Sequence, residues 1–320
     1  MFSRKAFVNS AQILYPMSDK FYTQSLRNLL LEVLESLDHS DTVFGLPQSE
    51  FFIPSKMNSL KITRYGETLA TPYGVAAGPH TQLSRNIVAS WLMGARYIEL
   101  KTVQTLDEIE VKKPCIDMQD EGYNCEWSQE LKIKNSFNEY LNAWIVIHII
   151  NHKMDWGSPI ETIFNMSVGY DLQGIMNENV QWFFDNMADC SFILAEKIKE
   201  IQNIYPAIDK LYIPNKISNN ITLSTMHGCP PNEIEEISAY LIREKKLHTT
   251  VKLNPTLLGP EKLRYILNEK LAYPIEVPQE AFHHDIKYAD ALSIIKNLWA
   301  LSQENNLHFA IKLTNTLEVK

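Results

Sequence analysis

The stretch Tyr97-Ile-Glu-Leu-Lys-Thr102 is a short, mostly apolar run that ends in a lysine and a threonine. Runs of this length are typical of buried strands in parallel sheets. Similar runs recur along the chain, and we predict six strands: Gly74–Ala77, Tyr97–Thr102, Thr162–Ser167, Ile221–Thr225, Thr249–Leu253 and His308–Thr314.

Helical patterns lie between most of these strands. We predict helices at Gln82–Leu92, Ser128–Lys153, Val180–Ile201, Pro231–Lys245 and Tyr288–Asn305. Alternation of strands and helices predicts parallel β-α-β units and therefore an α/β fold. Six strands suit a doubly wound sheet, whereas a closed barrel needs eight, and periodicity alone does not choose between the two.

Three further segments have recognisable patterns. Leucines at helical spacing predict an amphipathic helix at Phe21–Leu37. Residues 60–70 alternate around Gly66, which predicts a short hairpin. The connection Tyr205–Asn220 is rich in proline and asparagine and is expected to be an irregular loop.

The composition is that of a folded globular protein. Of the 320 residues, 45% are hydrophobic and 21% are charged. The formal net charge of −8 leaves no basic surplus to neutralise phosphates, which argues against a general nucleic-acid binder. A local basic pocket for one small anion remains compatible with this balance.

Cysteine usage and hydropathy indicate a cytoplasmic protein without a membrane span. The N-terminus lacks the long apolar run of a signal peptide. The most apolar stretch, Ala143–Ile150, is too short to cross a bilayer. No CxxC spacing is present, so we expect no zinc or iron–sulfur site, and free thiols are typical of the reducing cytosol. The four cysteines are Cys115, Cys125, Cys190 and Cys229.

Polar side chains gather where the predicted strands end. In parallel α/β proteins these carboxyl ends share one edge, where functional groups cluster. A lysine there can donate a hydrogen bond to the electron-rich side of a reduced flavin and offset its charge. Asparagine can pair with a ring amide or a carboxylate, and small residues let a flat ring lie against the backbone. The candidates are Lys101, Thr102, Asn165, Lys252, Asn254, Asn315, Thr316, Ala76, Ala77 and Gly78.

Two side chains before the helix at Pro231 are candidate proton donors. Cys229 is a candidate general acid toward a substrate carbon, and the positive end of the helix is expected to lower its pKa. The alternative is a structural cysteine. His227 either donates a proton or fills the mouth of the fold. Asn124 is either a substrate ligand or a turn residue.

The pair His283–His284 could suggest a metal site together with Asp285. Adjacent histidines do not share one face of a helix or strand. A helix start capped near Asp285 is therefore favoured, and we predict no bound metal.

The strand ends resemble the flavin-binding barrel of dihydropyrimidine and dihydroorotate dehydrogenases. Ala76-Ala-Gly-Pro-His-Thr81 and Tyr97-Ile-Glu-Leu-Lys-Thr102 resemble that family's first two strands. Val251-Lys-Leu-Asn-Pro255 and Leu313-Thr-Asn-Thr316 resemble the fifth and sixth, and Gly228-Cys-Pro230 resembles its Ser-Cys-Pro segment. The resemblance implies FMN contacts for Lys101, Thr102 and Lys252. It also implies substrate contacts for Asn124, Asn315 and Thr316, and the acid role for Cys229.

A closer resemblance is to the selenate reductase subunit family of flavin and iron–sulfur proteins. It extends from about Val43 to Leu317. Members are much longer, and FAD, NAD(P)H and iron–sulfur modules follow the barrel. The resemblance implies a helical extension over residues 1–56 and a partial (β/α)₈ TIM barrel over residues 57–320, with six of the eight strands. The phosphate-binding strands seven and eight are expected to be missing, which would weaken FMN binding.

One departure concerns the substrate. Met226 stands where the pyrimidine enzymes carry a substrate-binding asparagine. A ring amide left unpaired costs about 1–3 kcal/mol, so a pyrimidine is expected to fit less well.

The expected function is a flavin-dependent oxidoreductase module. FMN would pass electrons from the downstream modules to a small unsaturated, heterocyclic or oxyanion substrate, and the 320 residues alone are expected to be inactive. One alternative is a non-catalytic scaffold or a docking module for a redox partner. A second alternative is a Schiff-base aldolase on the same barrel, with Lys252 as the amine.

Overall fold

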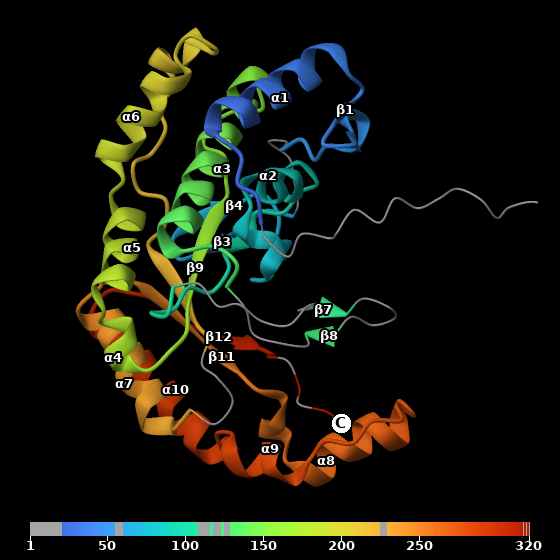
Figure 1. Ribbon diagram of the computed structural model, residues 1–320. Helices are drawn as coiled ribbons and strands as arrows, with labels where there is room; N and C mark the ends of the chain where they lie inside the picture. Colours follow the sequence, from blue (N-terminus) through green and yellow to red (C-terminus); the bar gives the residue numbers. More distant parts are fainter. Residues whose placement is uncertain are drawn as a thin grey trace, which may run out of the picture.

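The computed structural model describes residues 21–54, 60–107, 116–117, 123–124, 129–224, 229–315, 317 and 319. Its centre is a six-stranded parallel sheet in the order β12-β11-β10-β9-β6-β5 (Figure 1). The six predicted strands are thus confirmed, and each pairs with the next one along the chain. Their bounds are β5 Gly74–Val75, β6 Tyr97–Glu99, β9 Ile163–Val168, β10 Asn220–Leu223, β11 His248–Leu253 and β12 Phe309–Leu313.

Helices connect these strands and cover the sheet. Figure 1 shows α3, α5, α7 and α10 following one another around one face of it. The helices are α1 Leu26–His39, α2 Ser84–Leu92, α3 Ile133–Lys153, α4 Leu172–Ile175, α5 Glu178–Ala188, α6 Ser191–Ile201, α7 Pro231–Arg243, α8 Pro260–Arg264, α9 Gln279–His284 and α10 Tyr288–Glu304. Among the described residues, no helix is both long enough and apolar enough to cross a bilayer.

Short elements complete the fold. The segment 206–210 forms a 3₁₀ turn within the otherwise irregular connection predicted at Tyr205–Asn220. Two small antiparallel pairs are β1 (Thr42–Val43) with β2 (Leu46–Pro47), and β7 (Ile116–Asp117) with β8 (Tyr123–Asn124). Further single turns are η1 Gln48–Glu50, η2 Pro79–Gln82, η4 Pro255–Leu258 and the π-type turn η5 Tyr265–Lys270.

Three predicted helices have different bounds: α3 begins at Ile133 rather than Ser128, and local side-chain hydrogen bonds account for the other two. The helix expected at Val180–Ile201 is divided between α5 and α6. Asp189 lies at the break, and its carboxylate accepts hydrogen bonds from the backbone and hydroxyl of Ser191. Such a local bond competes with helix continuation and starts a new helix. In the first helix, Ser25 accepts a bond from the Asn28 backbone N–H, so α1 begins at Leu26 rather than Phe21.

The predicted hairpin covers the amino-terminal end of the sheet. It is formed by β3 (Ile62–Arg64) and β4 (Glu67–Leu69). Tyr65 and Gly66 both have positive φ, the geometry of a tight two-residue hairpin turn. The Tyr65 hydroxyl lies 2.6 Å from Thr250 Oγ1, and its ring stacks on His248 at 5.1 Å.

An ion pair shows that the sheet is strongly curled. Glu99 on β6 pairs with Lys312 on β12. These strands are four steps apart in the sheet order, so a flat sheet would separate them by about 19 Å. Direct contact requires the sheet to bend back on itself. The structure is therefore a half-barrel, which decides between the two arrangements that the periodicity left open.

Candidate functional site

Three charged side chains meet inside the curled sheet, near the strand carboxyl ends. Lys252 and Lys312 are register neighbours on β11 and β12. Lys312 pairs with Glu99 of β6, which is only 3% exposed. The same carboxylate accepts a hydrogen bond from the Ala77 N–H at 2.9 Å. This contact ties the loop after β5 to the interior ion pair.

Lys252 is an interior cation whose surroundings disfavour its charge. Burial lowers its pKa to about 8, the positive charges of Lys312 and Lys101 contribute in the same direction, and Glu99 opposes them. Within the described part of the chain, the Lys252 ammonium has no hydrogen bond or ion pair. A buried cation of this kind is stabilised by an anion or an electron-rich ring.

Lys101 and Thr102 follow β6 and are both buried. The Thr102 hydroxyl lies 2.8 Å from Ser167 Oγ at the end of β9. Lys101 acts electrostatically on Lys252, and its charge is one cause, after burial, of a lowered pKa at His80. Lys101 thus belongs to the same electrostatic cluster as Lys252 and Lys312.

Asn165 lies on β9 beside Glu99 and is fully buried. Its amide nitrogen donates to Thr222 Oγ1 at 2.7 Å. Among the described residues, Asn165 Oδ1 has no hydrogen-bond donor. A buried acceptor without a partner is costly, so this oxygen fits a ligand group that donates a hydrogen bond.

The small residues after β5 are closely packed. A Cβ atom at Gly74 would lie 2.0 Å from the Tyr97 carbonyl oxygen, so only glycine fits between these two strands. A Cβ atom at Gly78 would lie 2.6 Å from the His80 ring. Together with Ala76 and Ala77, these residues keep the loop close to the interior charges.

Cys229 precedes α7, as predicted, but its pKa differs from expectation. Burial and the nearby Glu233 raise the pKa of the thiol to about 12, whereas the sequence suggested that the helix end would lower it. The Cys229 sulfur lies 3.9 Å from Glu233 Oε2, and this negative charge opposes ionisation. The thiol therefore keeps its proton and is not activated as a nucleophile.

Of the remaining candidates for substrate binding and proton donation, only Asn315 lies within the described part of the chain with its side chain. The Asn315 N–H donates to the Leu253 carbonyl at 3.0 Å, so Asn315 lies beside the end of β11. Asn124 belongs to β8, but its side chain lies outside the described residues, as do His227 and Thr316.

The helix start expected near Asp285 is wrong. Asp285 follows the end of α9, and Lys287 precedes α10. The buried Asp285 carboxylate instead accepts a bond from Thr256 Oγ1 at 2.7 Å. Among the described side chains, no group of three or more His, Cys, Asp or Glu residues is arranged to hold a metal.

Sequence reasoning missed two residues of the cluster, Glu99 and Lys312. Both are charged residues within apolar strands, and Glu99 alternates with Lys101 toward the same side of β6. That alternation was a usable signal. The ion pair between Glu99 and Lys312 could not be predicted from the sequence, because it depends on the curl of the sheet.

The parallel half-barrel with charged strand ends defines the class of this chain as a TIM-barrel domain. Residues 44–320 match the family model described as "Oxidoreductase YgfK, N-terminal TIM-barrel domain". The chain therefore belongs to this oxidoreductase family, and the predicted incomplete (β/α)₈ fold is confirmed.

Known relatives agree with this membership. Two Escherichia coli proteins, from strain K12 and from O157:H7, are each named "Putative oxidoreductase YgfK" and are 42% identical to the chain over 324 residues. The match covers 94% of this chain and 31% of each relative, so the chain spans about a third of their length. A dihydroorotate dehydrogenase from Eimeria tenella, solved with ferulenol, is 12% identical, with 83% of this chain and 76% of that chain covered and a TM-score of 0.42.

Proposed function

We propose that this chain is the FMN-binding barrel of a cytoplasmic oxidoreductase that reduces a small unsaturated, heterocyclic or oxyanion substrate. The observation that carries the proposal is the meeting of Lys101, Lys252 and Lys312 with Glu99 inside the barrel. FMN, when bound, supplies two-electron chemistry by accepting and donating a hydride equivalent.

The residues present fit a flavin. The unpaired acceptor Asn165 Oδ1 suits a ring N–H, and the Lys252 ammonium suits the electron-rich side of the ring. The residues that would hold the cofactor are Ala76, Ala77, Gly78, Lys101, Thr102, Asn165 and Lys252. This donor set and the strand-end motifs together support FMN over other cofactors.

The protein's own residues would handle substrate binding and proton transfer. Asn124, Asn315 and Thr316 would bind and orient the substrate. Cys229 would hold a proton on Sγ, and its raised pKa keeps the thiol protonated before the substrate takes that proton. His227 would serve as a second proton donor.

Electron supply is proposed to come from other modules. The relatives are about three times as long as the matched region, which leaves room for FAD, NAD(P)H and iron–sulfur modules of the kind that the resemblance to the selenate reductase subunit family implies. These modules would be the partners of the barrel.

The experiment is FMN titration of the whole apoprotein, followed by flavin absorbance. Lys252→Met is expected to weaken FMN binding about tenfold or more, because the ring loses a charged donor. Lys210→Met, which changes an exposed lysine outside the cluster, is expected to bind FMN like the wild type. Equal affinity in all three proteins would contradict the proposal.

A second candidate function is favoured by one observation. The lowered pKa of Lys252, about 8, also suits an amine that forms a Schiff base. Borohydride treatment in the presence of dihydroxyacetone phosphate would add a stable mass to Lys252 if the barrel were an aldolase. Under the flavin proposal, Lys252 stays unmodified.

A further inference from the structure

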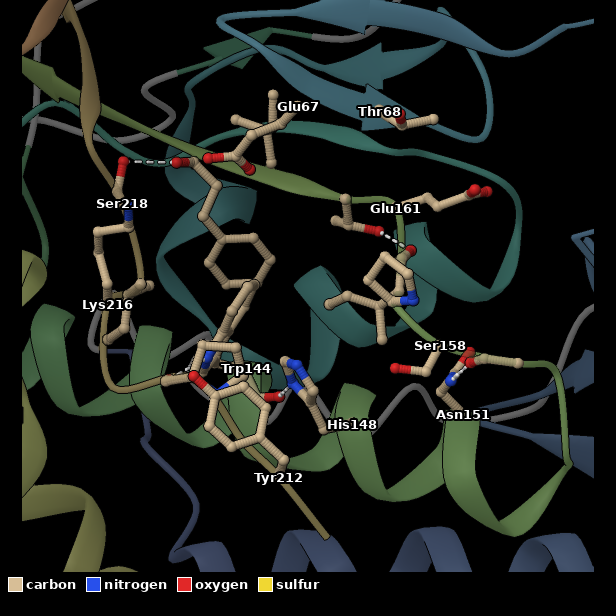
Figure 2. A pocket seen from close by; sticks show the side chains of 18 of the residues that line it. Glu67, Thr68, Trp144, His148, Asn151, Ser158, Glu161, Tyr212, Lys216 and Ser218 are labelled. Carbon is tan, nitrogen blue, oxygen red and sulfur yellow. Dashed lines mark hydrogen bonds between the residues drawn. The ribbon is translucent and has the colours of Figure 1, made fainter.

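A cavity of about 730 Å³ opens at the edge of the sheet opposite to the candidate site. It lies where β9 and β10 begin, between the last turns of α3 and the hairpin strand β4, with the loops 155–162 and 211–219 around it (Figure 2). Its volume is in the range of small-molecule sites. No residue of the candidate flavin site lines it, so the inference does not rest on the proposed function.

Several aromatic rings are among the residues that line the cavity. Trp144 is fixed by a hydrogen bond from its indole N–H to the Pro214 carbonyl at 3.0 Å. It packs edge-on against Phe164 and against His148, with ring centres 5.1 and 4.6 Å away. Tyr212 lies at the exposed side. Rigid rings of this kind favour a flat ligand that stacks on them or meets their edges.

His148 gives the cavity a directed acceptor. Its side chain is 7% exposed, and burial lowers its pKa to about 4, so the ring is neutral at physiological pH. Nδ1 lies 2.8 Å from the Trp144 carbonyl, which can only accept, and therefore Nδ1 carries the hydrogen. Nε2 then offers a lone pair, and no described residue donates to it.

The charges around the cavity disfavour an anion. Figure 2 shows Glu67 and Glu161 across from Trp144 and His148. Glu161 is neutralised by Lys61. Among the described residues, Glu67, Asp155 and one lysine, Lys216, also line the cavity. The lining therefore carries a small excess of negative charge.

We propose that this cavity binds a planar heteroaromatic molecule, uncharged or cationic, that donates an N–H hydrogen bond to His148 Nε2. The flat walls select the shape, the neutral histidine selects a donor, and the carboxylates exclude an anionic head group. Nothing in the oxidoreductase reaction requires this site, which lies at the amino-terminal ends of the strands.

The test uses benzimidazole and 1-methylbenzimidazole as probes, with affinities for the whole protein measured by ligand-detected NMR. The two probes have the same ring system, but the methylated one lacks the N–H. Benzimidazole is expected to bind about threefold to tenfold more tightly, the effect of one hydrogen bond. Indole-2-carboxylate, an anion of similar shape, is expected to bind more weakly than benzimidazole.

Variants assign the effect to the cavity. In His148→Leu the ratio of the two affinities is expected to fall to about one, whereas His283→Leu, far along the chain in α9, keeps the wild-type ratio. Tyr212→Ala changes an exposed ring, leaves the core intact and is expected to weaken both probes, while Tyr288→Ala is not. Equal binding of the two probes, an unchanged ratio in His148→Leu, or no saturable binding would overturn the proposal.

Discussion

Lys252 and Lys312 stand side by side on adjacent strands, an arrangement that like charges normally disfavour. Glu99 makes it tolerable because its buried carboxylate pairs with Lys312. Lys252 is left with a lowered pKa and without a described partner. The site therefore holds a positive charge on Lys252 that a bound anion or a reduced flavin ring would stabilise.

Removing Lys312 tests the ion pair. In Lys312→Met the Glu99 carboxylate stays buried without its cation, so the free energy of unfolding is expected to fall by about 2 kcal/mol. Urea denaturation measures this value. The double variant Glu99→Gln/Lys312→Met removes both charges and is expected to recover part of the loss. A single variant as stable as the wild type would show that the pair contributes nothing.

Lys252 predicts a pH dependence of stability. Its pKa is lowered from 10.5 to about 8 in the folded apoprotein, so between these values the unfolded chain binds more protons. Stability contributed by this group therefore rises from pH 8 to pH 10, by on the order of 2 kcal/mol. The rise is measured as the difference between the wild type and Lys252→Met. A constant difference over that range would contradict it.

Glu233 is expected to control the reactivity of Cys229. The carboxylate helps to keep the thiol pKa near 12, so Glu233→Gln should lower that pKa and speed alkylation at pH 8 severalfold. Peptide mass spectrometry after iodoacetamide treatment follows Cys229 alone. Glu236→Gln, an exposed change on the same helix, serves as the control. Unchanged alkylation in Glu233→Gln would mean that burial alone sets the pKa.

At the level of elements, a side-chain cap marks the start of α1. Ser25 caps α1 through its hydroxyl, and Ser25→Ala is expected to lower the free energy of unfolding by about 1 kcal/mol. Thr23→Ala, two residues earlier and exposed, should have a much smaller effect. Both values come from the same denaturation series. Equal effects of the two changes would show that the cap is not what matters.

The sequence predicted the elements better than their contacts. Strands, hairpin and most helices followed from apolar spacing and turn residues, because these signals are local. The division at Asp189 was missed since the apolar period continues through it, while the competing bond to Ser191 is specific to the folded chain. The Glu99–Lys312 pair joins residues 213 positions apart, and the raised pKa of Cys229 depends on packing, so neither could be predicted from spacing.

For the molecule as a whole, the curl of the sheet determines which side chains lie close together. It brings β6 and β12 into contact and gathers side chains from separate strands at the carboxyl ends. The opposite edge carries the separate cavity beside Trp144 and His148. The two edges therefore offer different chemistry, cationic at one end and neutral to acidic at the other.

A structure of the whole protein determined in the presence of FMN tests most directly whether the strand carboxyl ends hold the flavin. Flavin density is expected inside the barrel at the strand carboxyl ends, in contact with Lys101 and Lys252. The proposed flavin site would be contradicted if the protein, saturated with FMN, showed no flavin at these lysines or bound FMN only in another module.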